Sequence, residues 1–417
     1  MVYIFRLLIL AILLNTFNFA ADKEKIREQI TEIVANLPAT TKAAVLIYNP
    51  QTQDTIYSLN ADVSMIPASN TKLFTTATAL NLLGGDYALS TKLLCTDNNT
   101  KDGIINGNMY IKGFGNSTFT SEDMADMVQE LKRIGITRIT GSIIGDDTYF
   151  DSLYTRDDWI TDEAANVSLP PISAIVINRN TTLVQKKRGR RLRNYVSKVS
   201  NPPLFAAEML REKLINNGIS VAGSALAGEA PANSFTLSEK SIQLRKLIGM
   251  INKRSDNFLA ECLFKTIGAA ASGIQGNAFY STQAVLDFID DNGIFAKGTS
   301  VVDGSGISRF NQITTGAIAG LLEKMYFDIK NYEDYYNSLS IAGIDGTLRN
   351  RMKMTPAERN FHGKTGTLNG VTSIAGYVKA KNGEDLVLSM IFEYRNGSQY
   401  FHKRTEDAII EKLSEWE

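Results

Sequence analysis

One stretch of sequence decides the fold expected of this chain: Pro67-Ala68-Ser69-Asn70-Thr71-Lys72-Leu73-Phe74-Thr75-Thr76-Ala77-Thr78-Ala79-Leu80. The leading proline, the apolar run of good helix formers and the following Gly84-Gly85 predict a helix that Ser69 opens. Because residues three apart share a helix face, the Ser69 hydroxyl and the Lys72 ammonium should project into the same space. A serine becomes a nucleophile when a nearby base takes its proton, and a lysine with a lowered pKa can be that base.

Two later segments complement this Ser-x-x-Lys pattern, which by itself also fits a capped helix followed by an exposed lysine. Ser255-Asp256-Asn257 lies in a loop that enters a predicted helix, and Lys364-Thr365-Gly366-Thr367 lies on a predicted strand. The three motifs occur in the order found in penicillin-binding proteins and class A β-lactamases. Their combination favours acyl transfer through a serine nucleophile.

The charged and hydroxyl groups of these motifs have separate roles in such a reaction. Ser255 can relay a proton between the base and the leaving amine. Asn257 can hydrogen-bond the substrate amide and Lys72. We expect Lys364 to lower the Lys72 pKa by like-charge repulsion and to attract a terminal carboxylate of the substrate.

The strand that carries the third motif should contact the substrate backbone. Thr365 adds a hydroxyl to the site for the terminal carboxylate. Gly366 has no side chain, so a substrate backbone can lie against the strand edge. The backbone N–H groups of Ser69 and Thr367 would then form an oxyanion hole.

Composition argues against several other classes of protein. The 417 residues carry 44 basic and 44 acidic side chains, which gives no overall attraction to nucleic acid. With only two histidines, His362 and His402, and two cysteines, Cys95 and Cys262, neither a metal site nor a cofactor is expected. A histidine triad would leave the lysines of the motifs unexplained. The two cysteines are not a disulfide framework, although they could pair in an oxidising compartment.

The first 20 residues have the layout of a secretory signal peptide. A positive charge at Arg6 precedes the apolar run 7–14, and small residues at 20–21 precede a charged segment. The apolar run is too short to span a bilayer, and no other stretch is apolar enough. We therefore expect an exported protein without a transmembrane segment after processing, periplasmic or, in an organism with one membrane, extracellular. An uncleaved anchor is the alternative.

The hydrophobic pattern predicts an α+β fold with an insertion. A helix, a hairpin and the Ser69 helix come first, and helices and a three-stranded meander return near the end of the chain. The meander could pair with the early hairpin in one sheet. The expected elements are helices at 24–37, 241–251, 256–268, 276–291, 313–326 and 404–415, and strands at 43–49, 55–59, 361–368, 371–379 and 386–394. Residues 21–90 and 241–417 should thus form one discontinuous domain.

The segment between the two halves of that domain is expected to hold two strand-rich lobes. Residues 91–160 and 220–240 are assigned to one lobe and residues 161–219 to the other, with a strand at 173–178. The basic stretch Lys186–Arg193 is either a solvated hairpin tip or a patch that faces an anionic envelope polymer or lipid headgroups.

With these motifs in place, the chain resembles the low-molecular-mass class C penicillin-binding proteins, also called peptidase family S13. Three further blocks match that family: Met109–Asn116, Val302–Arg309 and Ala342–Leu348. The resemblance covers essentially the whole mature chain and implies a penicillin-binding-protein/β-lactamase-like domain. The long segment between Ser69 and Ser255 is similar to the family's inserted domains, which class A β-lactamases lack.

The resemblance also implies the reaction. Ser69 would attack the carbonyl between two D-alanines of a peptidoglycan stem peptide, D-alanine would leave, and water would hydrolyse the acyl-enzyme. Endopeptidase cleavage of cross-links is the same chemistry, and β-lactams should acylate Ser69. A non-catalytic peptidoglycan-binding scaffold and a β-lactamase are the alternatives. The intact motifs argue against the scaffold, and no second base for fast deacylation is evident.

Three residues are implied at the side-chain end of the substrate. Asp146 matches the family's insert carboxylate best, with Asp147 as the alternative. Arg309 matches a family arginine. Asn369 stands where relatives often carry glutamine, which leaves the subsite preference open.

Overall fold

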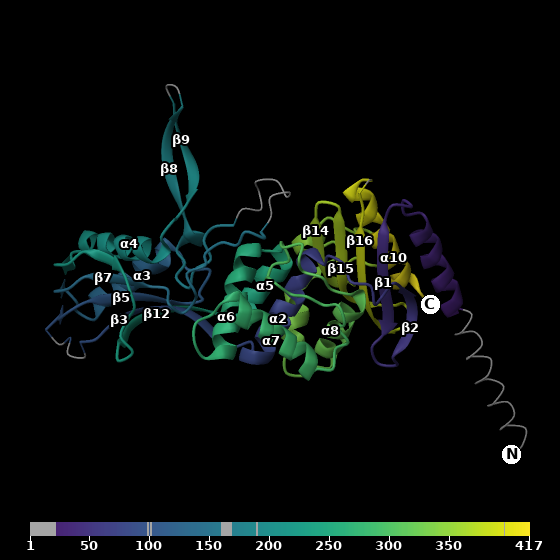
Figure 1. Cartoon of the computed structure of the whole chain (residues 1–417), viewed down its shortest axis with the longest axis horizontal. Helices are drawn as coiled ribbons and strands as arrows, with labels where there is room; N and C mark the ends of the chain where they lie inside the picture. Colours follow the sequence, from purple (N-terminus) through teal and green to yellow (C-terminus); the bar gives the residue numbers. More distant parts are fainter. Residues whose placement is uncertain (1–21, 98–99, 101, 160–168, 189–190, 396) are drawn as a thin grey trace, which may run out of the picture.

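The computed structural model describes residues 22–97, 100, 102–159, 169–188, 191–395 and 397–417. The expected signal peptide at 1–20 lies outside these residues. Within the described part of the chain, no helix is both long and apolar enough to cross a membrane. Figure 1 shows an elongated molecule with a helix-covered sheet in one half and the inserted, strand-rich segment in the other.

A six-stranded sheet forms the centre of the first half. Its strand order is β13-β14-β15-β16-β1-β2. The early strand β1 pairs antiparallel with the late strand β16, with Ala44 opposite Ile391. The expected union of the early hairpin with the terminal meander is therefore confirmed. The strands are β1 (Lys42–Asn49), β2 (Asp54–Leu59), β13 (Ser340–Ile341), β14 (His362–Leu368), β15 (Val371–Lys379) and β16 (Asp385–Glu393).

The two faces of this sheet pack against different helices. Successive side chains point to opposite faces of a strand, and Val45 joins one buried cluster while Ala44 joins another. The Val45 side is covered by an N-terminal helix (22–35) and by α10 (Gln399–Glu415). The Ala44 side is covered by α2 (Thr71–Leu83), α5 (Leu244–Arg254), α6 (Asn257–Ser272), α7 (Ala278–Asp291), α8 (Thr315–Phe327) and α9 (Tyr332–Ser338). The serine, lysine and asparagine of the first two sequence motifs lie on this second side.

The inserted segment has a core of its own. A five-stranded sheet with the order β11-β7-β5-β3-β12 packs against two helices, and a small sheet has the order β10-β6-β4. Leu210 of one helix and Ile111 of β5 belong to the same buried cluster. The elements are β3 (Ala88–Cys95), β4 (Ile104–Ile105), β5 (Met109–Phe114), α3 (Ser121–Arg133), β6 (Arg138–Ile139), β7 (Ile143–Asp146), α4 (Pro202–Asn216), β10 (Ser220–Val221), β11 (Ala225–Ala227) and β12 (Phe235–Gln243).

An irregular segment joins the two cores. Residues 173–178 were expected to form a strand, but residues 172–177 pair with no neighbouring strand. Their side chains alternate between clusters, because Ala174 and Val176 pack in the core behind the sheet while Ile175 and Ile177 pack in the core of the insertion. The apolar composition that suggested a strand reflects this position between two buried surfaces.

The basic stretch lies on a two-stranded hairpin of β8 (Thr181–Arg188) and β9 (Arg191–Lys198). The hairpin projects from the body of the molecule (Figure 1). Leu183 and Val196, which face each other across it, are 68% and 71% exposed. This position fits the expected hairpin tip and leaves its function open.

The two cysteines lie in different parts of the structure. Cys95 ends β3 in the insertion, and Cys262 lies within α6. Both are buried free thiols. The pairing that the sequence allowed is therefore not formed.

Candidate active site

The candidate nucleophile lies in a strained turn directly before α2. Residues Ala68–Asn70 form a 3-10 turn, and the α-helix begins only at Thr71. Ala68 has a φ of 49°, which is an unfavourable conformation for a residue with a Cβ atom. The predicted helix is thus confirmed, but Ser69 precedes it in a tighter turn and is half-buried.

Lys72 contacts Ser69 one turn later, as the spacing predicts. Its Nζ lies 3.1 Å from Ser69 Oγ and 2.7 Å from Asn257 Oδ1. It also donates to the backbone carbonyl of Ser305. The last two partners can only accept hydrogen bonds in this geometry. A neutral amine that donates its two N–H groups to them has its lone pair directed at the Ser69 hydroxyl.

Burial accounts for the low basicity of this lysine. The side chain of Lys72 is fully buried, and burial lowers its pKa to about 8. Negative charges on Asp303, Glu261 and Asp256 oppose that shift. The sequence had predicted repulsion from Lys364 as the cause. That repulsion is instead seen at Lys364, whose pKa is held well below its ordinary value by burial and by the Lys72 charge.

The second motif is held between two helices. Ser255 ends α5 in a left-handed conformation with φ 54°, and Asp256 caps α6 by accepting from Leu259 N at 3.1 Å. Arg179 of the insertion binds both carboxylate oxygens of Asp256, at 2.7 and 2.9 Å. Burial raises the pKa of Asp256, but the Arg179 pair and the Leu259 N–H outweigh it and keep that pKa below its ordinary value.

The third motif closes the site from the sheet side. Lys364 Nζ donates to Ser255 Oγ at 2.9 Å, and Thr365 Oγ1 donates to Thr347 Oγ1 at 2.8 Å. The neighbouring strand β13 pairs only with the start of β14, at His362 and Gly363. The edge of β14 that follows is therefore left without a strand partner in the described part of the chain, which suits the addition of a peptide strand.

Gly366 is required by packing as well as by access. A Cβ atom there would lie 2.8 Å from the Pro67 carbonyl oxygen and 3.0 Å from Ser69 N, and would overlap Ser373 Oγ. Ser373 Oγ itself donates to the Pro67 carbonyl at 2.7 Å. The strand thus lies directly against the nucleophile turn, which adds a reason for glycine that the sequence did not reveal.

The residues expected at the substrate's side-chain end are less closely grouped. Arg309 Nη2 donates to the Asn369 carbonyl at 2.7 Å, and both residues line a cavity beside the end of β14. Asp146 is fully buried in the insertion and pairs with Lys112 at 2.8 Å. The alternative, Asp147, is partly exposed.

Sequence reasoning missed two groups that contact the motifs. They are the Ser305 carbonyl, which binds Lys72, and the Thr347 hydroxyl, which binds Thr365. Both fall in the blocks Val302–Arg309 and Ala342–Leu348, which matched the family without an assigned role. A backbone carbonyl leaves no side-chain signature, so the sequence gives no direct signal for the first of them.

One prediction concerns the turn that carries Ser305. Gly306 has φ +78° and its Cβ position overlaps the Ala68 carbonyl, so we expect Gly306→Ala to destabilise the fold by about 2–4 kcal/mol. Urea unfolding measures this loss. Gly218→Ala is the matched control, because Gly218 has φ +83° with nothing within 4 Å of its Cβ position. Equal losses in both variants would contradict a steric contact at Gly306.

The fold and the motifs together define an active-site serine enzyme of the penicillin-binding-protein class. An antiparallel sheet covered by helices on both faces holds the three motifs in mutual contact. The chain belongs to the D-Ala-D-Ala carboxypeptidase 3 (S13) family, whose sequence model matches residues 26–194 and 190–415. The expected family is therefore confirmed.

Individual relatives agree with this assignment. The D-alanyl-D-alanine carboxypeptidase of Actinomadura sp. strain R39 is 27% identical over 94% of this chain and 85% of its own length. The carboxypeptidase DacB of Haemophilus influenzae is 24% identical over 85% and 86%. The crystal structure of penicillin-binding protein 4 from H. influenzae has a TM-score of 0.79 at 23% identity, covering 92% of this chain and 98% of that one. A second structure of that protein is a complex with a β-lactam.

Proposed function

We propose that Ser69 is the nucleophile of this D-Ala-D-Ala carboxypeptidase and Lys72 its general base. The family makes the chain a serine-type carboxypeptidase. The observation that carries the residue assignment is the set of three contacts to Lys72 Nζ, two with acceptors and one with Ser69 Oγ. A pKa of about 8 leaves part of the Lys72 population neutral near pH 7, as a general base requires.

Acylation then follows from this arrangement. Lys72 takes the Ser69 proton as Ser69 Oγ attacks the carbonyl carbon between the two D-alanines. Negative charge develops on the carbonyl oxygen, for which we assign the backbone N–H groups of Ser69 and Thr367 as donors. The proton that Lys72 has taken is relayed through Ser255, which contacts Lys364, to the leaving amine. The C–N bond breaks, D-alanine leaves, and water later hydrolyses the ester on Ser69.

The substrate is proposed to lie along the open edge of β14. Lys364 and Thr365 would receive its terminal carboxylate, and Gly366 lets its backbone approach the strand. At the other end, Arg309 and Asn369 line the cavity into which a stem-peptide side chain could extend. From the insertion, we propose Asp147 in place of Asp146, because Asp146 is fully buried and paired with Lys112.

Three further assignments are part of the proposal. Peptidoglycan stem peptides are the substrates, cross-links are cleaved by the same chemistry, and β-lactams are covalent inhibitors. Residues 1–20 are a signal peptide that directs the chain to the periplasm. Residues 21–90 and 241–417 form the catalytic domain. Two insert lobes were expected, 91–160 with 220–240 and 161–219, but α4 of the second shares the buried cluster of β5 in the first, so we propose a single inserted unit with a projecting hairpin.

Release of D-alanine from a stem pentapeptide tests this function. We expect one D-alanine per peptide, and complete inhibition after one equivalent of benzylpenicillin has reacted. No release and no penicillin adduct would favour the non-catalytic scaffold. Destruction of the drug without a lasting adduct would favour a β-lactamase.

A further inference from the structure

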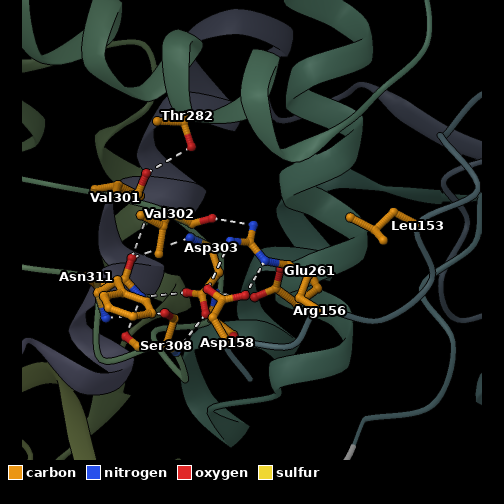
Figure 2. Close-up of polar contacts among 12 residues, drawn as sticks. Leu153, Arg156, Asp158, Glu261, Thr282, Val301, Val302, Asp303, Ser308 and Asn311 are labelled. Atoms are coloured by element: carbon orange, nitrogen blue, oxygen red, sulfur yellow. Dashed lines mark hydrogen bonds and ion pairs between the residues drawn. The ribbon is translucent and has the colours of Figure 1, made fainter. Parts of the chain in front are cut away.

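A buried pair of carboxylates lies behind the catalytic lysine and has no role in the steps described so far. Figure 2 shows Glu261 of α6 and Asp303 among their polar contacts. Glu261 is 3% exposed and Asp303 is fully buried. Charged side chains are rarely buried to this extent without a specific function for the charge or for its hydrogen bonds. Both carboxylates are directed at the loop 303–308, which includes the Ser305 carbonyl.

Asp303 fixes the shape of this loop. Its Oδ1 accepts from Gly306 N at 2.7 Å and from Asn311 Nδ2 at 2.8 Å, and its Oδ2 accepts from Ser308 N at 2.8 Å. These contacts close a tight turn over the Ala68 carbonyl, which is why only glycine fits at 306. The turn is therefore built from its own residues.

Glu261 fixes the position of Ser305 within the turn. Its Oε1 accepts from Ser305 N at 2.7 Å, while the carbonyl of the same residue accepts from Lys72. Glu261 follows Asn257 by four residues, so the two side chains lie on one face of α6. Helix α6 therefore positions both groups that accept from Lys72. It carries Asn257, whose side chain is one acceptor, and Glu261, which holds Ser305, whose carbonyl is the other.

We propose that Glu261 is a positioning residue for Lys72, which it orients by holding the Ser305 carbonyl at the amine. The inference rests on Lys72 being the general base of the proposed function. Asp303 holds the peptide unit of the Ser305 carbonyl through Gly306 N, and Glu261 holds the preceding peptide unit through Ser305 N. Without the contact from Glu261, Ser305 is held on one side only and can shift, so the Lys72 lone pair is no longer fixed on Ser69. Orientation losses of this kind cost catalysis without weakening ligand binding.

The charge state of Glu261 is coupled to that of Lys72. Burial, and then the Asp303 charge, raise the pKa of Glu261 to about 8. Burial also raises the pKa of Asp303, but its hydrogen bonds from Ser308, Asn311 and Gly306 oppose that rise. We therefore assign the first negative charge of the pair to Asp303.

The other charged groups around Glu261 come from the insertion, from the start of α6, from α2 and from β14. Arg156 of the insertion donates to the Val302 carbonyl at 2.6 Å and pairs with Asp158 at 2.9 Å (Figure 2). Asp256 lies at the start of α6, and Lys72 and Lys364 lie on α2 and β14. Among these groups, Lys72 loses its proton in the same pH range as Glu261 itself, because the pKa of each is about 8.

This overlap has a consequence for the pH dependence of acylation. When Lys72 and Glu261 together lose one proton, two forms of the enzyme result. The form with neutral Lys72 and protonated Glu261 is active, and the form with charged Lys72 and ionised Glu261 is inactive. Glutamine at 261 keeps an acceptor for Ser305 N and removes the inactive form. In Glu261→Gln, the acylation rate should therefore rise with pH as a single ionisation, with a midpoint at lower pH than in wild type.

The test compares acylation by benzylpenicillin in wild type, Glu261→Ala and Glu261→Gln between pH 5.5 and 9.5. We expect Glu261→Ala to acylate roughly 10- to 100-fold more slowly with little change in non-covalent affinity. Glu261→Gln should stay within about threefold of wild type at pH 7, with its midpoint lower by about half a pH unit. Glu406→Gln, at a fully buried carboxylate paired with Arg351 in the opposite core, is the control for a general loss of stability.

The outcomes separate this inference from the proposed function. The positioning role is overturned if folded Glu261→Ala is acylated at the wild-type rate, or if Glu261→Gln is as slow as Glu261→Ala. It is also overturned if the pH midpoint of Glu261→Gln is unchanged, or if Glu406→Gln slows acylation equally. If wild type itself is not acylated, or Lys72→Met reacts as fast as wild type, the proposed function fails and the positioning role fails with it.

Discussion

Ser69→Ala should form no covalent adduct with benzylpenicillin, whereas wild type should gain the mass of one drug molecule. The Ser69 hydroxyl is the group that Lys72 Nζ contacts at 3.1 Å, and alanine leaves the lysine with no nucleophile to activate. Loss of the nucleophile in serine enzymes of this kind lowers turnover by factors of about 10⁶. Intact-mass spectrometry after incubation with the drug measures the adduct directly.

The control for this experiment is Ser121→Ala, at the first residue of α3 in the insertion. It should be acylated like wild type. A stoichiometric adduct on Ser69→Ala would contradict the assignment, and peptide mapping would then identify the true nucleophile. Because the contacts of the Ser69 side chain are few, we expect the variant to fold normally, and its melting temperature provides that check.

Lys72→Met should slow acylation by a factor of about 10³, within the range usual for loss of a general base. Methionine keeps most of the buried volume but can neither accept the Ser69 proton nor bind Asn257 and Ser305. Stopped-flow or quench measurements with a chromogenic β-lactam give the acylation rate. Non-covalent affinity should change much less, because Lys364 and Thr365 remain.

The pH dependence of the same rate provides a second test. In wild type the neutral form of Lys72 is the active one, so the rate should rise with pH through the Lys72 pKa of about 8 and fall tenfold per unit below it. Lys72→Met should lose this dependence. Lys265→Met is the control, since that buried lysine pairs with Asp151 at 2.5 Å, and it should keep the wild-type profile. A rising profile retained in Lys72→Met would assign the base elsewhere.

Much of the catalytic half could be predicted because its signals are local. The Ser69–Lys72 spacing, the glycines after α2 and the Asn-Gly turn at 369–370 each act within a few residues. The contact between Lys72 and Ser69 follows from helix geometry alone. The early hairpin and the terminal meander were each predicted from strand-like runs and turn residues, which made their pairing possible, and the structure confirms it.

What the sequence did not reveal depends on contacts between distant segments. The Ser305 carbonyl has no side-chain signature, and Glu261 looks like an ordinary helical glutamate until its burial is known. The predicted strand at 173–178 failed because both of its faces are buried without a strand partner. The cause of the low Lys72 pKa also needed the structure, since depth of burial cannot be read from one sequence.

The pairing of β1 with β16 has a consequence for the order of synthesis. A nascent chain presents Ser69 and Lys72 long before Lys364 exists, and the edge of β1 cannot be covered until β16 has been made. Such non-local contacts form slowly, whereas the insertion is continuous in sequence and can collapse first. The site is therefore incomplete until the last strands have been synthesised, and a prematurely terminated chain that lacks β14 carries Ser69 and Lys72 without Lys364.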